Sequence, residues 1–65
     1  MNKFSQHLKA LRKTTGMTQK TVAKHLGVVE SCYANWEQGR TEPNIESIRK
    51  LVMLFEISYD DFFDL

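Results

Sequence analysis

The segment formed by residues 17–39 constrains the fold most, because it holds two short helical patterns separated by a single glycine. Apolar residues recur three or four positions apart on both sides of Gly27, which is the spacing of one helix face. Gly27 stands where a tight turn requires a positive φ, and Gly39 stands at the end of the second pattern for the same reason. The segment therefore predicts two short helices joined by a turn at Gly27.

The residues before this segment predict another helix. Phe4, Leu8 and Leu11 follow helical spacing, and Gly16 is suited to the positive φ that ends many helices. Thr18 is the predicted N-cap of the next helix, because its hydroxyl can accept a hydrogen bond from a free backbone amide. The inward positions expected in the two helices that flank Gly27 are Val22, Ala23, Leu26, Tyr33 and Trp36.

The last third of the chain predicts two further helices. Pro43 disfavours a helical Glu42, which leaves Asn44 as the natural cap of a fourth helix. Ser58, followed three residues later by Asp61, resembles a capping box that begins a short fifth helix. The apolar stripe expected on the fourth helix is Ile45, Ile48, Leu51, Val52 and Phe55, and the fifth helix is expected to end in Phe62 and Phe63. Since no segment alternates like a strand, the sequence predicts an all-α fold of five short helices around one compact core.

Length and composition limit the broad class of protein. The chain has 65 residues, which allows one small domain spanning residues 1–65. The single cysteine, Cys32, excludes an internal disulfide and favours a reducing compartment. No apolar stretch approaches the roughly 20 residues that span a bilayer, and the N-terminus has no apolar signal region. We therefore expect a cytoplasmic protein without a membrane segment.

The charge of the chain is unevenly distributed, although the net charge is only +1. Residues 1–40 contain seven basic and two acidic residues, a net charge of +5, whereas residues 41–65 contain two basic and six acidic residues, a net charge of −4. The basic part is suited to face the phosphates of a nucleic acid while the acidic part points away. Ordinary surface charge is the alternative, and the charge pattern alone leaves both open.

Catalysis and metal binding find little support in the sequence. His7, His25 and Cys32 are the only histidine and cysteine residues, and their spacing fits no zinc pattern. No glycine-rich phosphate loop or nucleophile motif is present, and the C-terminal aspartates lack the spacing of a calcium loop. We therefore expect a protein that is not an enzyme and that needs no metal or other cofactor.

Several short fragments of the chain, in this order, resemble one known family. They are Leu11-Arg12-Lys13, Gly16-Met17-Thr18-Gln19, Val22-Ala23, Leu26-Gly27-Val28, Trp36-Glu37-Gln38-Gly39, Arg40, Pro43 and residues 57–63. Together they resemble the Cro/repressor-type helix-turn-helix proteins, the lambda-repressor-like or XRE family of phage and bacterial regulators. The resemblance covers nearly the whole chain. It implies a DNA-binding domain whose helix-turn-helix occupies about residues 18–38, with residues 29–38 similar to the recognition helix.

The resemblance also implies which residues read the bases of DNA. Val29, Glu30, Ser31 and Asn35 match the outward positions of the recognition helix. Asn35 can pair with adenine, Ser31 can donate or accept, Glu30 can accept from cytosine, and Val29 can touch a thymine methyl group. Valine stands where the family usually has a capping Ser or Thr, so the start of the helix is expected to shift or to rely on Glu30. Glu30 either reads a cytosine, or disfavours other sequences, or only stabilises the positive end of the helix.

Other residues match positions that contact the DNA backbone or support the fold in this family. Gln19 matches a glutamine that contacts a phosphate, and Arg12 with Glu37 matches an ion pair between the first and third helices. The residues expected at the DNA backbone are Thr18, Gln19, Gln38, Arg40 and Thr41. Phosphate contacts of this kind position a protein on DNA without reading its sequence.

The resemblance leaves two functions to be compared. The first is a sequence-specific repressor that binds a pseudopalindromic operator as a homodimer. The dimer would use the outer faces of the fourth and fifth helices, and the candidate contact residues are Tyr59, Phe63 and Leu65. The alternative is an antitoxin-like or accessory module whose main partner is another protein. Salt separates the two, because DNA binding weakens steeply as salt rises and an apolar protein contact does not.

Overall fold

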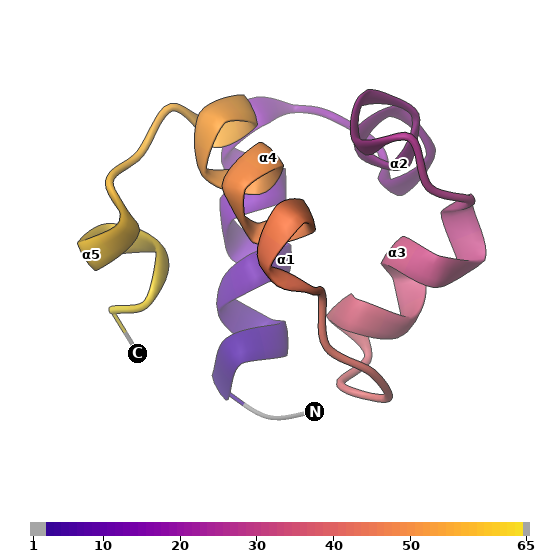
Figure 1. Cartoon of the computed structure of the whole chain (residues 1–65), viewed down its shortest axis with the longest axis horizontal. Coiled ribbons are helices and arrows are strands. Elements are labelled where there is room, and N and C mark those ends of the chain that lie inside the picture. The colour runs from indigo at the N-terminus through magenta and orange to yellow at the C-terminus, as the bar shows by residue number, and fades with distance from the viewer. Residues whose placement is uncertain (1–2, 65) are drawn as a thin grey trace.

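The computed structural model describes residues 3–64 and contains five helices and no strand within them (Figure 1). They are α1 (Lys3–Thr15), α2 (Gln19–Leu26), α3 (Glu30–Glu37), α4 (Ile45–Phe55) and α5 (Tyr59–Phe62). The all-α, five-helix fold predicted from the sequence is therefore confirmed.

Side chains predicted as caps begin three of the helices. Thr18 accepts a hydrogen bond from the amide of Thr21 at 3.1 Å, and Asn44 accepts one from the amide of Ser47 at 2.8 Å. Ser58 accepts from the amide of Asp61 at 3.1 Å, which supplies the Ser58 half of the predicted capping box. These bonds satisfy amides that have no partner inside their own helix, so local sequence fixes where α2, α4 and α5 begin.

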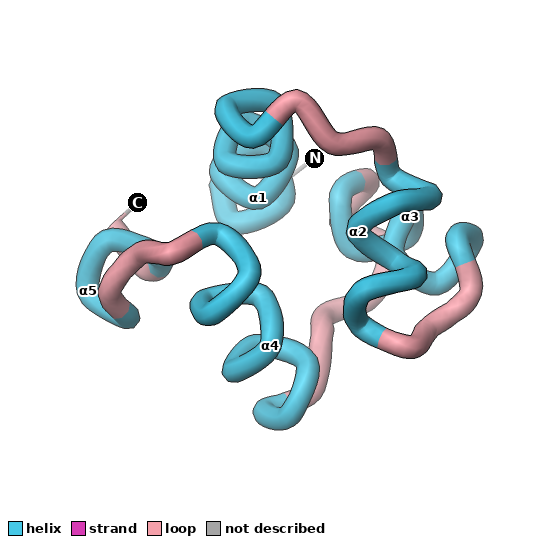
Figure 2. Tube along the Cα trace, turned by 90° about the horizontal axis from the view of Figure 1, so that it is seen from above, coloured by secondary structure: helices cyan, strands magenta, loops and turns pink. Residues whose placement is uncertain are grey.

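The helices surround the core in an open ring (Figures 1 and 2). In both views α2 and α3 lie side by side at one side of the molecule and α5 lies at the opposite side, with α1 and α4 between them. The exposed face of α3 is therefore separated from α5 by the width of the core.

Buried residues from all five helices form one core. Its members are Leu8, Val22, Ala23, Leu26, Tyr33, Trp36, Leu51, Val52, Phe55 and Phe62. The rings of Tyr33 and Trp36 meet edge to face with centroids 5.7 Å apart, so the inward positions expected in α3 are correct. Ile45 was expected in the apolar stripe of α4, but it is 74% exposed. Helical spacing gives the direction of a side chain, and it does not show whether a neighbouring element lies opposite.

Aromatic contacts attach α5 to α1. Phe4 meets the buried ring of Phe62 edge to face at 5.7 Å and stacks on Phe63 at 6.3 Å. His7 Nε2 donates a hydrogen bond of 3.0 Å to the carbonyl oxygen of Asp61. Phe63, directly after α5, nevertheless remains about half exposed, so Phe62 closes the core while the next ring faces solvent.

Candidate nucleic-acid interface

A three-residue turn orients α3 relative to α2. Gly27 adopts a φ of 74°, and its amide donates to the carbonyl of Lys24 at 3.2 Å. The amide of Val28 donates to the carbonyl of Ala23 at 3.1 Å. These two bonds close the last turn of α2 in the manner of a glycine-ended helix, so the sequence correctly placed the turn at Gly27.

The start of α3 lacks a side-chain cap. Val29 is the N-cap residue and makes no capping hydrogen bond with its side chain. Its backbone carbonyl accepts from the amides of Cys32 at 3.1 Å and Tyr33 at 3.3 Å. The helix begins directly after Val29, so of the two expected alternatives, a shifted start or reliance on Glu30, the shift does not occur.

The outward face of α3 is exposed at its N-terminal end and partly exposed one turn later. Val29 is 69% exposed, and Glu30 and Ser31 are also exposed. Asn35 is half-buried and lies one helical turn beyond Ser31, on the same face. The opposite face is buried in the core, so α3 has one face fixed by packing and one face free to meet a ligand.

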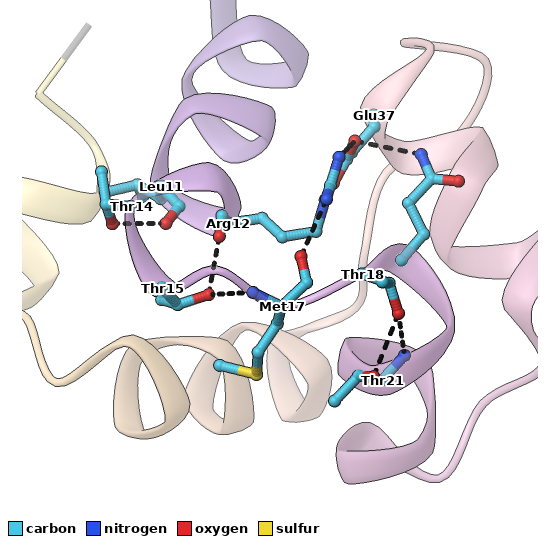
Figure 3. A network of polar contacts seen from close by, with 9 residues as sticks. Leu11, Arg12, Thr14, Thr15, Met17, Thr18, Thr21 and Glu37 are labelled. Atoms are coloured by element: carbon cyan, nitrogen blue, oxygen red, sulfur yellow. Dashed lines mark hydrogen bonds and ion pairs between the residues drawn. The ribbon is translucent and has the colours of Figure 1, made fainter.

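A buried ion pair anchors the C-terminal end of α3 to α1 (Figure 3). Arg12 Nε donates to Glu37 Oε2 at 2.6 Å and Arg12 Nη2 donates to Glu37 Oε1 at 3.2 Å. Arg12 Nη1 also donates to the carbonyl of Met17 at 2.9 Å, in the loop before α2. The Glu37 side chain is only 2% exposed, and that of Arg12 is 13% exposed. One guanidinium group therefore connects α1, the loop that leads into α2, and α3.

Burial and hydrogen bonding act in opposite directions on the Glu37 carboxyl group. Burial raises its pKa, but hydrogen bonds from Arg12 and Gln19 and the charge of Arg12 outweigh burial, so the pKa lies below its ordinary value. Burial, followed by the neighbouring Glu37 carboxylate, raises the pKa of the Tyr33 hydroxyl. Among residues 3–64, no group lies at hydrogen-bond geometry to this buried hydroxyl. We therefore assign the effect of Glu37 on the pKa of Tyr33 to its charge. Glu37 is thus ionised and Tyr33 neutral at neutral pH.

Gln19 lies beside the ion pair. Its Nε2 donates to Glu37 Oε1 at 3.1 Å, which brings the first turn of α2 into the same cluster as Arg12. A side-chain amide carries two N–H donors, and the geometry uses one of them on Glu37. The sequence does not predict this contact, because the two residues are 18 positions apart and no local pattern joins them.

The remaining residues expected at the DNA backbone lie at the two ends of the helix pair. Thr18 is exposed, and its hydroxyl is engaged with the amide and hydroxyl of Thr21. Gln38, Arg40 and Thr41 are exposed in the loop that follows α3. The amide of Arg40 donates to the carbonyl of Asn35 at 3.0 Å, so the backbone of this loop is fixed while its side chains face solvent.

Comparison with known sequences identifies the family. The helix-turn-helix family model matches residues 8–62 of the chain. The chain belongs to this family. The match includes all of α2, the turn and α3, which are the elements whose geometry is described above.

The helix-turn-helix relatives of the chain include named regulators. The chain is 31% identical over 58 residues to the HTH-type transcriptional activator BcrR of Enterococcus faecalis, which is 89% of this chain and 28% of that protein. It is 32% identical over 57 residues to YonR, an SPbeta prophage-derived HTH-type transcriptional regulator of Bacillus subtilis, which is 88% of this chain and 53% of that protein. The chain thus spans about half or less of the length of these relatives.

A solved helix-turn-helix structure closely matches the whole fold. The P22 c2 repressor, in complex with a synthetic operator, superimposes with a TM-score of 0.84 and 27% sequence identity, covering 95% of this chain and 94% of that one. Together with the family match, this likeness confirms the resemblance to the Cro/repressor-type proteins that the sequence fragments indicated.

Two other features of the described part of this helix-turn-helix chain bear on its chemistry. Residues 3–64 contain no group of three or more His, Cys, Asp or Glu side chains placed to hold a metal ion. Over the same residues, every helix is too short or too polar to cross a membrane.

Proposed function

We propose that this chain is a sequence-specific DNA-binding transcriptional regulator in which residues 1–65 act as one helix-turn-helix domain in the cytoplasm. The observation that carries the proposal is the division of α3 into one face packed in the core and one accessible face. The fold is also that of a repressor whose solved structure contains a synthetic operator. In the proposed complex α3 lies in the major groove of DNA.

The exposed face of α3 supplies the proposed base contacts. Asn35 pairs with adenine, Ser31 donates to or accepts from a base edge, and Val29 contacts a thymine methyl group. Glu30 accepts from the amino group of cytosine, and it disfavours bases that offer only acceptors at that position. Because Ser31 and Asn35 are one turn apart on the same face, these contacts fall on neighbouring base pairs.

The ends of the helix pair supply the proposed phosphate contacts. The Gln19 amide donates its second N–H to a phosphate oxygen while Glu37 holds the first. The exposed side chains of Thr18, Gln38, Arg40 and Thr41 contact the backbone on either side of the groove. The net charge of +5 over residues 1–40 supports this orientation.

Repression is the proposed mode of regulation. A domain bound in the major groove at a promoter excludes other proteins from the same DNA, and this needs no additional activity of the chain. The similar proteins include an activator and a repressor, so the mode of regulation needs its own test. In this test a reporter promoter overlaps the DNA site that the protein selects from random duplex DNA. Loss of reporter expression supports repression, and a gain of expression contradicts it.

Homodimerisation through α4 and α5 completes the proposal. Tyr59 is 51% exposed and Phe63 is 49% exposed, so both rings are accessible to a second copy. Leu65, the third candidate, lies outside the described residues. A two-fold dimer reads half-sites about 34 Å apart on a pseudopalindrome. Sedimentation equilibrium that shows only monomer at high concentration, with and without operator DNA, would refute the dimer.

A second candidate function is binding of a protein partner. An open cavity of about 260 Å³ lies between α1, the loop before α4, α4 itself and the C-terminal end of α5. It is lined by Phe4, Glu42, Pro43, Ile48 and Phe63. An antitoxin-like or accessory role would use this apolar cavity rather than α3. Its complexes would persist at high salt, where DNA binding is weak.

Selection of bound sites from random duplex DNA tests the proposed function. Wild-type protein is expected to enrich one short pseudopalindromic site, and its affinity for that site is expected to fall steeply with rising salt. If no sequence is enriched, the DNA-reading function is wrong and the protein-binding candidate takes its place.

A further inference from the structure

A lysine from outside the helix-turn-helix contacts the turn between α2 and α3. Lys50, in α4, donates a hydrogen bond from Nζ to the carbonyl oxygen of Leu26 at 3.3 Å. Leu26 is the last residue of α2, and its side chain is buried in the core. The ammonium group therefore lies at the negative end of α2, where a positive charge is favourable.

This contact complements the local hydrogen bonds of the turn. The carbonyls at the end of a helix have no partner within it, and the amides of Gly27 and Val28 satisfy those of Lys24 and Ala23. The carbonyl of Leu26 is satisfied from α4 instead, by a residue 24 positions away. The carbonyl groups at the end of α2 thus accept hydrogen bonds both from residues of the turn and from a residue of α4.

The beginning of α3 makes this external contact important. Val29 provides no side-chain cap, so the first turn of α3 is held by its backbone carbonyl and by the turn before it. Val29, Glu30 and Ser31 occupy this end of α3, and they are three of the four proposed base-reading residues. A small rotation of the turn would move all three relative to the groove.

We propose that Lys50 is a positioning residue for the base-reading helix: by holding the carbonyl end of α2 it fixes the turn and the first residues of α3. This inference rests on the proposed function, because the positions that it controls are those proposed to meet DNA. Lys50 acts through the turn and does not itself contact a base or a phosphate.

Amide hydrogen exchange in the free protein tests the structural half of the proposal. The Lys50→Met variant keeps most of the aliphatic stem but loses the donor and the charge, and Arg49→Met removes one charge from the adjacent exposed position. The reporting amides are those of Val28 and Cys32, whose acceptors are the carbonyls of Ala23 in α2 and of Val29 at the start of α3. In Lys50→Met their exchange is expected to accelerate about three- to tenfold, while the amide of Gln38 at the other end of α3 is unchanged. Arg49→Met is expected to match wild type at all three, and Lys50→Arg to restore slow exchange.

Binding to the selected DNA site tests the functional half. Lys50→Met is expected to lose about three- to tenfold in preference at the base pairs read from Val29, Glu30 and Ser31, and less than twofold at the base pair read from Asn35. The slope of log affinity against log salt is expected to stay at the wild-type value. A lysine that contacted a phosphate directly would instead lower that slope by about 0.9.

Three results would overturn the proposal: unchanged exchange at Val28 and Cys32 in Lys50→Met, equal acceleration in Arg49→Met, or a reduced salt slope. If wild-type protein selects no DNA site, the proposed function fails by its own test. Exchange at the two reporting amides still shows whether Lys50 holds the turn, so the two failures are distinguishable.

Discussion

Replacement of Glu37 by alanine is the most informative perturbation of the fold, because this carboxylate accepts three hydrogen bonds from two other elements. Arg12 supplies two of them, at 2.6 Å and 3.2 Å, and Gln19 supplies the third, at 3.1 Å. In Glu37→Ala the guanidinium group stays in place with no carboxylate beside it. We therefore expect a loss of folding stability together with a loss of DNA affinity.

The magnitude follows from the burial of the pair. Removing one partner of a buried ion pair costs about 3–5 kcal/mol, since the other charge is left uncompensated. Arg12 keeps its bond to the carbonyl of Met17 and is 13% exposed, so we expect the lower value, about 3 kcal/mol. A chain of 65 residues has a total stability of only about 3–10 kcal/mol. The melting temperature should therefore fall by about 12–24 °C.

Thermal unfolding followed by circular dichroism measures this effect, and Glu30→Ala is the matched control. Glu30 is exposed on the same helix, so its replacement should change stability by less than about 0.5 kcal/mol. The double variant Arg12→Met with Glu37→Met removes both charges and should be more stable than Glu37→Ala, because no stranded charge remains. A Glu37→Ala protein that melts within 2 °C of wild type (roughly 0.5 kcal/mol) would refute the argument.

Three further variants test separate parts of the structure. Because the folded pKa of Glu37 lies below its ordinary value of 4.5, its ionised form contributes stability above that pH, and this contribution is lost as pH falls through the folded pKa. Denaturation across this acid range should show wild type losing more stability than Glu37→Gln, and parallel losses would contradict the pKa direction. Val29→Thr supplies the missing side-chain cap of α3 at a position that is 69% exposed. The substitution should raise the stability measured by urea denaturation by about 1 kcal/mol. A decrease would show that α3 gains nothing from a cap. Glu56 follows α4 with a φ of 55°, which is strained for a residue with a side chain. Glu56→Gly should raise stability by about 0.5 kcal/mol, after the larger unfolded-state entropy of glycine is subtracted. Lower stability would argue against strain at this position.

Local chemistry explains why the sequence predicted the helix boundaries well. Thr18 and Asn44 begin helices because a side-chain oxygen three residues before an amide can accept from it, and Gly27 ends one because it tolerates a positive φ. These effects involve residues within one turn of each other. They can therefore be inferred from sequence without knowledge of the tertiary structure.

Contacts between distant segments were harder to predict. The exposure of Ile45 depends on which elements lie opposite the start of α4, and helical spacing carries no such information. The bonds from Gln19 to Glu37 and from Lys50 to Leu26 join residues 18 and 24 positions apart. The outward residues of α3 followed from the family resemblance and from helical geometry together, and their contacts with DNA remain predictions.

In the proposed complex α3 reads the bases and the following loop holds the phosphate backbone. Affinities of wild type, Asn35→Ala and Arg40→Ala for the selected site and all its single-base variants separate these two roles, with each protein first shown to be folded by circular dichroism. Asn35→Ala should lose preference at one base pair in each half-site, by about 1–3 kcal/mol, and Arg40→Ala should weaken every sequence alike and lower the salt slope by about 0.9. Uniform weakening by Asn35→Ala, with unchanged preference at every base pair, would contradict the assignment of α3 as the reading helix.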